Sequence, residues 1–175
     1  MPRTAWRRTA AVLALTLVPV LSACSIGVNA GTSTQGPSGN GASADAGPMQ
    51  LRGITIVTGA GGGSDATILG TIVNTSPTVD DVLTGVTVTD PTGATATITG
   101  TAVTSGQIPV PANRPTSSVR LGFNSDYHVD LTGLHIDPTA FAQVQFTFQN
   151  AGSVVVPTMA VPPTGIYAGL GPLAG

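Results

Sequence analysis

The sequence predicts an all-β domain, built as an antiparallel β-sandwich of about seven to nine short strands. Three observations lead to this class. Short segments rich in Val, Ile, Thr and Phe recur along residues 51–161, and Gly, Pro, Asn, Asp or Ser bounds each of them. The clearest of these segments alternates apolar and polar residues, which is the pattern of a half-buried strand. No window shows the period of an amphipathic helix.

The first four expected strands are rich in β-branched residues. They are LRGITIV (51–57), ATILGTIVN (66–74), TGVTVTD (84–90) and GATATITG (93–100). The glycine-rich run TGAGGGSD (58–65) joins the first two, and we interpret it as a hairpin connection. A phosphate-binding loop is excluded there, because no helix follows and the chain has no lysine.

The last four expected strands are SSVRLGF (117–123), YHVDLTGL (127–134), FAQVQFTFQ (141–149) and GSVVVP (152–157). In FAQVQFTFQ, Val144, Phe146 and Phe148 fall on one face, while three glutamines and a threonine fall on the other. We therefore expect both phenylalanines in the core of the sandwich.

The N-terminus has the layout of an export signal. Arginines precede an apolar run over residues 10–21, which is shorter than the about 20 residues of a membrane span. The run ends in Leu21-Ser22-Ala23-Cys24, which resembles the bacterial lipobox. We expect a lipoprotein signal peptide over residues 1–23 and acylation of Cys24, the only cysteine. The alternative is an ordinary signal peptide with an incidental cysteine, and both the general and the twin-arginine export routes stay open.

The segments on either side of the expected domain have a different composition. Residues 24–50 consist mostly of Gly, Ala, Ser, Thr and Asn, which predicts a flexible tether behind the lipidated cysteine. One β-sandwich domain is expected over residues 51–161. The Pro- and Gly-rich tail over residues 162–175 is expected to be loosely held.

The charge balance excludes some partners. Beyond the signal peptide the chain has only Arg52, Arg114 and Arg120 against eight aspartates, with no lysine and no glutamate. Such an acidic chain disfavours nucleic acid and offers no basic patch for anionic lipids. The expected partners are the membrane, through the N-terminal lipid, and an unidentified envelope protein or ligand.

Catalytic motifs are missing from the sequence. There is no G-x-S-x-G nucleophile elbow, and only two histidines are available as a base. The aspartates fall in turns such as TVDD and TDPTG, where carboxylates usually bond to the local backbone. We therefore expect a protein that is not an enzyme and has no catalytic residues.

The stretch YHVDLTGL carries the weak metal candidates. Its alternation directs Tyr127, Val129 and Leu131 to the core and leaves His128 and Asp130 side by side on the opposite face. Imidazole and carboxylate suit Zn(II) or Cu(II), but the only other plausible donors are His135 and Met159. A solvated polar pair is the preferred interpretation, and no cofactor is expected, with a copper ion as the alternative.

Three segments carry a family resemblance: NTSPTVDDVLTGVTV, IPVPANRPTSSVRLGFNSDYHVDLTGL and FAQVQFTFQNAGSVVVP. In order and spacing they resemble the periplasmic copper chaperones called PCu(A)C, and more closely the actinobacterial lipoproteins of the LpqE type. The resemblance covers residues 51–157 and implies a cupredoxin-like sandwich. It also implies that His128 matches the histidine of an H-x-M copper pair, whereas Asp130 replaces the methionine. The upstream His and Met ligands are absent from GATATITGTAVTSGQIPVPAN.

These observations predict a membrane-anchored lipoprotein at the extracytoplasmic face of the cell membrane. Its role is expected to be non-catalytic binding or scaffolding, on a copper-chaperone-like fold whose Cu(I) site is degenerate. The alternative is a metal chaperone that uses His128 together with ligands from a partner protein.

Overall fold

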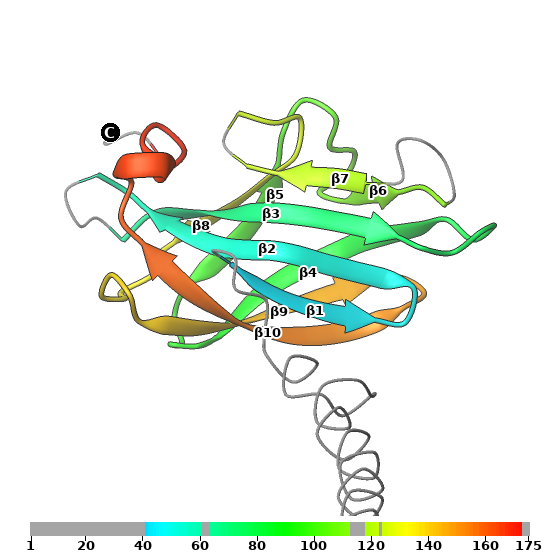
Figure 1. The fold of residues 1–175 in the computed structure, drawn as a ribbon, viewed down its shortest axis with the longest axis horizontal. Coiled ribbons are helices and arrows are strands. Elements are labelled where there is room, and N and C mark those ends of the chain that lie inside the picture. The colour runs from blue at the N-terminus through cyan, green and yellow to red at the C-terminus, as the bar shows by residue number, and fades with distance from the viewer. Residues whose placement is uncertain (1–40, 61–63, 113–117, 123, 173–175) are drawn as a thin grey trace, which may run out of the picture. The chain divides into compact units, whose positions relative to one another are not determined.

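The computed structural model describes residues 41–60, 64–112, 118–122 and 124–172 (Figure 1). Among them are ten strands and one 3-10 helix. The strands are β1 (Ala42–Ala46), β2 (Met49–Thr58), β3 (Ala66–Asn74), β4 (Asp81–Asp90), β5 (Thr95–Thr99), β6 (Ile108–Val110), β7 (Ser118–Leu121), β8 (His128–Thr132), β9 (Phe141–Phe148) and β10 (Gly152–Val161), and the 3-10 helix η1 is Gly165–Tyr167. In the part of the chain that the structure describes, no helix is long and apolar enough to cross a membrane.

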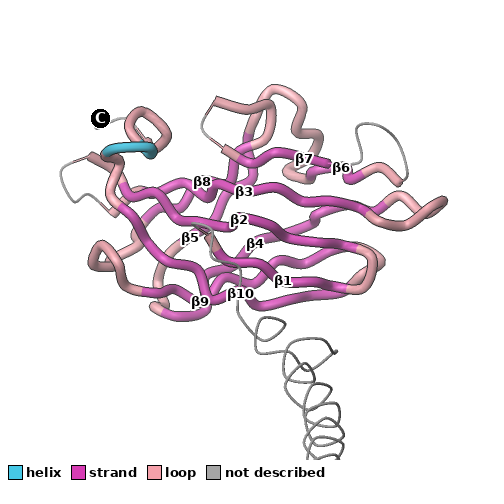
Figure 2. Tube along the Cα trace, in the orientation of Figure 1, coloured by secondary structure: helices cyan, strands magenta, loops and turns pink. Residues whose placement is uncertain are grey.

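The strands form two layers that face each other (Figures 1 and 2). One layer has the order β5-β8-β3-β2, with β1 paired to β2 and β7 paired to β3. The other has the order β10-β9-β4-β6. A short parallel pairing, Ala160 with Ile56 and Val161 with Val57, joins β10 to β2, and every other pairing between strands is antiparallel. The predicted all-β sandwich is confirmed, and each of the eight expected segments contains a strand.

Period-two alternation places the core between the layers. Along β9, positions 142, 144, 146 and 148 are buried while the residues between them are half-buried. Phe146 is 0% exposed and Phe148 is 3% exposed, as the sequence predicts. On β8, Val129 and Leu131 are buried in the same cluster, and Tyr127 packs against it. Apolar side chains on one face of each sheet therefore form the single core.

The tether predicted for residues 24–50 is wrong at its C-terminal end. Residues 42–46 form β1, which pairs with β2, and Met49 is fully buried. The composition ASADA gave no strand signal, because alanine and aspartate are poor strand formers. The pairing of β1 with β2 stabilises the strand. Close packing of the Gly41 backbone against Gly53 adds to this, since a Cβ on Gly41 would lie 2.5 Å from the carbonyl carbon of Gly53. Residues 24–40 lie outside the described part of the chain.

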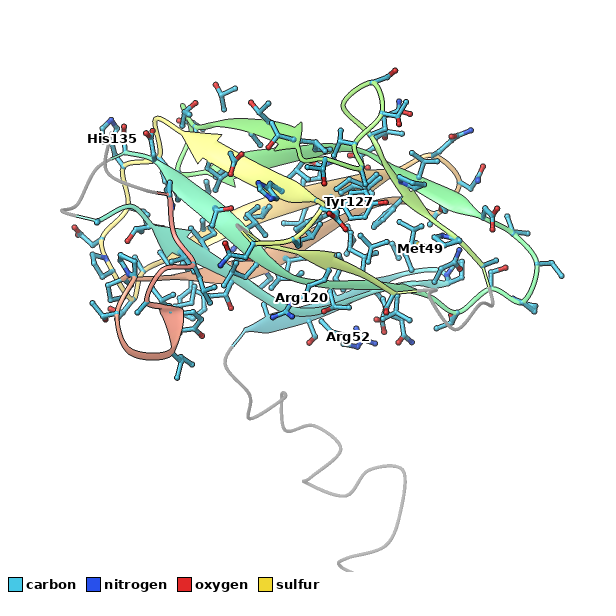
Figure 3. All side chains as sticks on the ribbon, turned by 90° about the horizontal axis from the view of Figure 1, so that it is seen from above. Met49, Arg52, Arg120, Tyr127 and His135 are labelled. Carbon is cyan, nitrogen blue, oxygen red and sulfur yellow. The ribbon has the colours of Figure 1, made fainter. Side chains whose placement is uncertain are left out.

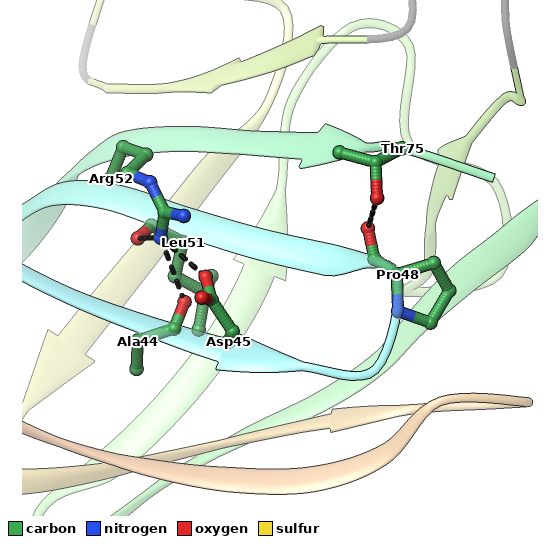
Figure 4. A network of polar contacts seen from close by, with 6 residues as sticks. All are labelled: Ala44, Asp45, Pro48, Leu51, Arg52 and Thr75. Atoms are coloured by element: carbon green, nitrogen blue, oxygen red, sulfur yellow. Dashed lines mark hydrogen bonds and ion pairs between the residues drawn. The ribbon is translucent and has the colours of Figure 1, made fainter. Parts of the chain in front are cut away.

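Polar contacts hold β1 against the domain (Figure 4). The Arg52 guanidinium donates from Nη1 to the carbonyls of Ala44 (3.1 Å) and Leu51 (2.8 Å), and it lies 2.6 Å from a carboxylate oxygen of Asp45. Close to the β1–β2 turn, the Thr75 hydroxyl donates to the carbonyl of Pro48 at 2.9 Å. Residues 39–175 form one compact unit that contains the whole described core.

The C-terminal segment is also more ordered than expected. Val57 faces away from the core, since its neighbour Ile56 points into it, yet Val57 is fully buried. Gly171 packs there, so closely that a Cβ would lie 2.7 Å from the Thr58 carbonyl oxygen and 3.1 Å from Cγ1 of Val57. The tail, expected to be loosely held, thus packs closely on the domain at Gly171, while most of residues 164–169 are exposed.

Candidate functional site on strand β8

Strand β8 lies between β3 and β5, and residues of these two strands surround its polar face. Asp130 is opposite Thr67 of β3 and Thr97 of β5, and His128 is opposite Thr99 of β5. Directly opposite residues in an antiparallel pair share a face. His128 and Asp130 therefore lie on the outer face, as predicted, next to threonine side chains of β3 and β5.

The Asp130 carboxylate accepts hydrogen bonds from both neighbouring strands. The Thr99 hydroxyl donates to Oδ2 at 2.8 Å, and the Thr67 hydroxyl lies 3.3 Å from Oδ1. Thr67 is fully buried, and its hydroxyl also lies 3.3 Å from the carbonyl of Val129. Each carboxylate oxygen thus has a hydroxyl partner, and Asp130 links three strands.

The His128 ring is held by the turn that precedes β8. Its Nε2 atom lies 2.5 Å from the carbonyl oxygen of Ser125. A carbonyl oxygen can only accept, so Nε2 carries the proton in this hydrogen bond. The Ser125 hydroxyl in turn contacts the carbonyls of Arg120, Gly122 and Tyr127. A metal ion at Nε2 would have to displace the contact to Ser125.

The other predicted donors are not brought to this face. His135 is exposed and lies at one end of the molecule, well separated from Tyr127 (Figure 3). Met159 belongs to β10, which is separated from β8 by β2 and β3 in the strand order. Within the described ranges, no three His, Cys, Asp or Glu side chains are grouped to hold a metal ion. Cys24 lies outside those ranges.

Two residues of the segment NTSPTVDD, which is part of the family resemblance, make buried hydrogen bonds that the sequence did not predict. The Asn74 amide donates to the carbonyls of Val79 (2.9 Å) and Val110 (3.0 Å), and its oxygen accepts from the amide of Ser76. Asp81, only 3% exposed, accepts three backbone hydrogen bonds. These polar residues therefore fix the start of β4 and its contact with β6.

No protein-family model matches the sequence, and no curated protein matches it. Solved structures do match. The copper-bound PCuAC domain of PmoF2 is 21% identical with a TM-score of 0.57, and the match covers 69% of this chain and 98% of that domain. The apo PCuAC domain of PmoF1 is 20% identical with a TM-score of 0.58, covering 69% of this chain and 99% of that domain. The apo PCuAC domain of PmoF2 is 20% identical with a TM-score of 0.55, covering 71% and 97%.

The fold and these matches define the class of the domain. It is an all-β, mostly antiparallel protein with the cupredoxin-like fold of PCuAC domains, as the resemblance implied. At about one residue in five identical, the likeness concerns the fold. The narrower resemblance to lipoproteins of the LpqE type stays a prediction.

Proposed function

We propose that this protein is an exported lipoprotein, anchored by Cys24 at the extracytoplasmic face of the cell membrane, whose domain binds or scaffolds an envelope component. It performs no reaction of its own, and its copper-chaperone-like fold does not hold Cu(I) with its own side chains. The anchor rests on the lipobox LSAC and on the apolar run before it.

The main support for the proposal is the residue type and the hydrogen bonding of Asp130. The resemblance puts the thioether of an H-x-M copper pair at this position. A carboxylate is there instead, and hydroxyls of Thr99 and Thr67 occupy its oxygens. Cu(I) prefers soft sulfur ligands, and Met159 belongs to a distant strand while Met49 is fully buried. The face therefore favours a polar contact surface over a Cu(I) site.

A metal carrier is the second candidate. Its support is that His128 stands at the position of the family histidine and that one matching structure is a copper-bound domain. Such a carrier would combine His128 with ligands from a partner protein. A metal bound through Nε2 would replace the hydrogen bond to Ser125, whereas one bound through Nδ1 would leave that bond in place.

A competition titration against a Cu(I) chelator, on residues 39–175, separates the two candidates. We expect no tight Cu(I) binding, and only a modest gain for Asp130→Met, because the upstream ligands stay absent. Any Cu(II) or Zn(II) bound should be weak, should weaken further on acidification, and should vanish in His128→Ala. His135→Ala is the matched control and should change nothing. Tight, stoichiometric Cu(I) binding by the unaltered domain would place the metal carrier first.

A further inference from the structure

A cavity of about 490 Å³ opens along one edge of the sandwich. Its walls come from both layers, with β4 and β6 on one side and β7 and Tyr127 on the other. Residues of β6 and of β7 line this one cavity. β6 ends its sheet, and β7 pairs only with β3, so no described strand closes the gap between them.

Apolar side chains make up most of the cavity wall. They are Val82, Pro109, Val110, Pro111 and Val119. Val110 is 0% exposed and Val119 is 5% exposed, so the inner part of the wall belongs to the core. The volume falls within the roughly 300–1,000 Å³ of small-molecule sites, which are concave and mostly apolar. Proline and β-branched valine have few rotamers, so such a wall is preformed.

Tyr127 adds a polar group to this apolar wall. Its backbone is fixed on both sides: the amide donates to the Ser125 hydroxyl at 3.2 Å, and the carbonyl accepts from Ser125 and from the amide of Gly122. The phenol hydroxyl has no hydrogen-bond partner among the residues that the structure describes. A phenol can donate and accept, so it can orient one polar group of a ligand.

Two carboxylates give the cavity its charge. Asp80 and Asp81 both contribute to the wall. Asp80 accepts from the amide of Ala112 at 2.7 Å, and both oxygens of Asp81 accept from backbone amides. Backbone amides thus occupy both oxygens of Asp81 and one oxygen of Asp80, and both carboxylates place negative charge beside the cavity. An anionic ligand would be repelled.

We propose that this cavity binds an uncharged, largely apolar small molecule with one hydrogen-bonding group, which Tyr127 orients. The proposal rests on the binding role proposed above and gives that role a ligand class. It does not depend on the lipid anchor or on the state of the β8 face. Small aromatic or short-chain amphiphiles of the envelope have this chemistry, whereas free fatty acids are excluded by their charge.

Two dyes with one skeleton test the proposal. N-Phenyl-1-naphthylamine is neutral, and 8-anilino-1-naphthalenesulfonate carries the same two ring systems with a sulfonate. In fluorescence titrations of residues 39–175, the neutral dye should bind saturably at one site. The sulfonate should bind at least about tenfold more weakly, because of Asp80 and Asp81.

Variants locate the binding site of the neutral dye. Val119→Phe and Pro111→Phe narrow the cavity from two sides and should weaken binding about tenfold or more. Tyr127→Phe should weaken it several-fold, through loss of one hydrogen bond. Val155→Phe, on the exposed outer face of β10, is the matched control and should leave binding unchanged. Thermal melting of each variant confirms the fold, and Pro111→Phe serves if Val119→Phe does not fold.

Three results would overturn the proposal: no saturable binding of the neutral dye, equal binding of both dyes, or undiminished binding in the folded cavity variants. Each is distinguishable from failure of the proposed function, because the Cu(I) titration uses the same protein and reads a different face. If the domain bound both the neutral dye and Cu(I) tightly, the ligand proposed for the cavity would stand. The metal carrier would then replace the binding or scaffolding role as the proposed function.

Discussion

Asp81 ties two distant parts of the chain together with one buried carboxylate. Oδ1 accepts from the amides of Val82 (2.7 Å) and Asn150 (2.9 Å), and Oδ2 accepts from the amide of Ala151 (2.9 Å). The last two amides belong to the turn between β9 and β10, about 70 residues away along the chain. Asp81 therefore fixes the start of β4 against the end of the β9–β10 hairpin.

Replacing Asp81 by alanine should lower the free energy of unfolding by about 3 kcal/mol or more. The change leaves three backbone amides without their charged acceptor, and each such hydrogen bond contributes roughly 1.5–3 kcal/mol. Urea unfolding measures the loss. Asp80→Ala is the control: Asp80 is exposed, and among the described residues its carboxylate accepts only from the amide of Ala112, so the change should cost under about 1 kcal/mol. Similar losses in both variants would contradict this account.

At the scale of single residues, the sequence predicted on which face of a strand a side chain lies, but not its hydrogen-bond partners. Alternation placed His128 and Asp130 correctly on the outer face of β8. It could not show that Thr99 and Thr67, which lie 31 and 63 residues away, satisfy the Asp130 carboxylate. It also could not assemble the cavity, whose wall combines four separate segments. Such contacts depend on strand order and register, which local patterns do not encode.

At the scale of the element, β9 tests the period of two. Phe146→Ala removes a fully buried ring and should cost about 3–5 kcal/mol of the free energy of unfolding. Gln145→Ala, one position out of phase and half-buried on the other face, should cost well under about 1 kcal/mol. Chemical denaturation gives both values. Comparable losses at the two positions would mean that β9 does not present alternate faces to the core and to solvent.

Strand β1 gives a second prediction at this scale. A chain that starts at Met49 lacks β1, its pairing with β2 and the contacts of Arg52 with Ala44 and Asp45. It should melt roughly 5–10 °C below a chain that starts at residue 39, which corresponds to about 2 kcal/mol for a domain of this size. Calorimetry of the two chains measures the difference. Equal melting temperatures would show that β1 adds nothing and that the tether extends to residue 48.

The elements that the sequence missed share one property. The eight expected strands are rich in valine, isoleucine, threonine or phenylalanine, which fit a pleated, half-buried surface. β1 reads ASADA and β6 reads IPV, so neither has a run of such residues long enough to detect. Both are edge strands that pair with one neighbour each. Tertiary pairing, rather than intrinsic propensity, makes them strands.

At the scale of the whole molecule, the proposed acylation of Cys24 gives a testable prediction about where the domain works. Intact mass spectrometry of the protein from its own envelope should show loss of residues 1–23 and gain of acyl groups on Cys24. More than one acyl chain makes anchoring stable, at about 0.8 kcal/mol per buried methylene. Cys24→Ala should therefore be released or stay uncleaved. A variant that is both correctly processed and membrane-bound would refute the lipobox assignment.

The layout of the two sheets could be predicted only in part. Strand count and composition indicated a sandwich, and the resemblance indicated its cupredoxin-like form. The parallel contact of β10 with β2 and the packing of Gly171 on Val57 depend on backbone approaches that leave no residue pattern. Glycine and proline marked residues 162–172 as irregular, but irregular backbone can still be closely packed.

The position of β1 also determines how the domain would respond to force. A pull transmitted from an anchored N-terminus enters at Ala42, which is paired with Ile54, and then reaches the Arg52 contacts. Directed away from the sheet, such a pull separates β1 from β2 pair by pair, and each residue released adds about 3.3 Å of extension. At Met49 the load meets a side chain buried in the core, and further extension requires the sandwich to open. β1 would thus absorb the first displacement between membrane and domain and leave both the β8 face and the cavity intact.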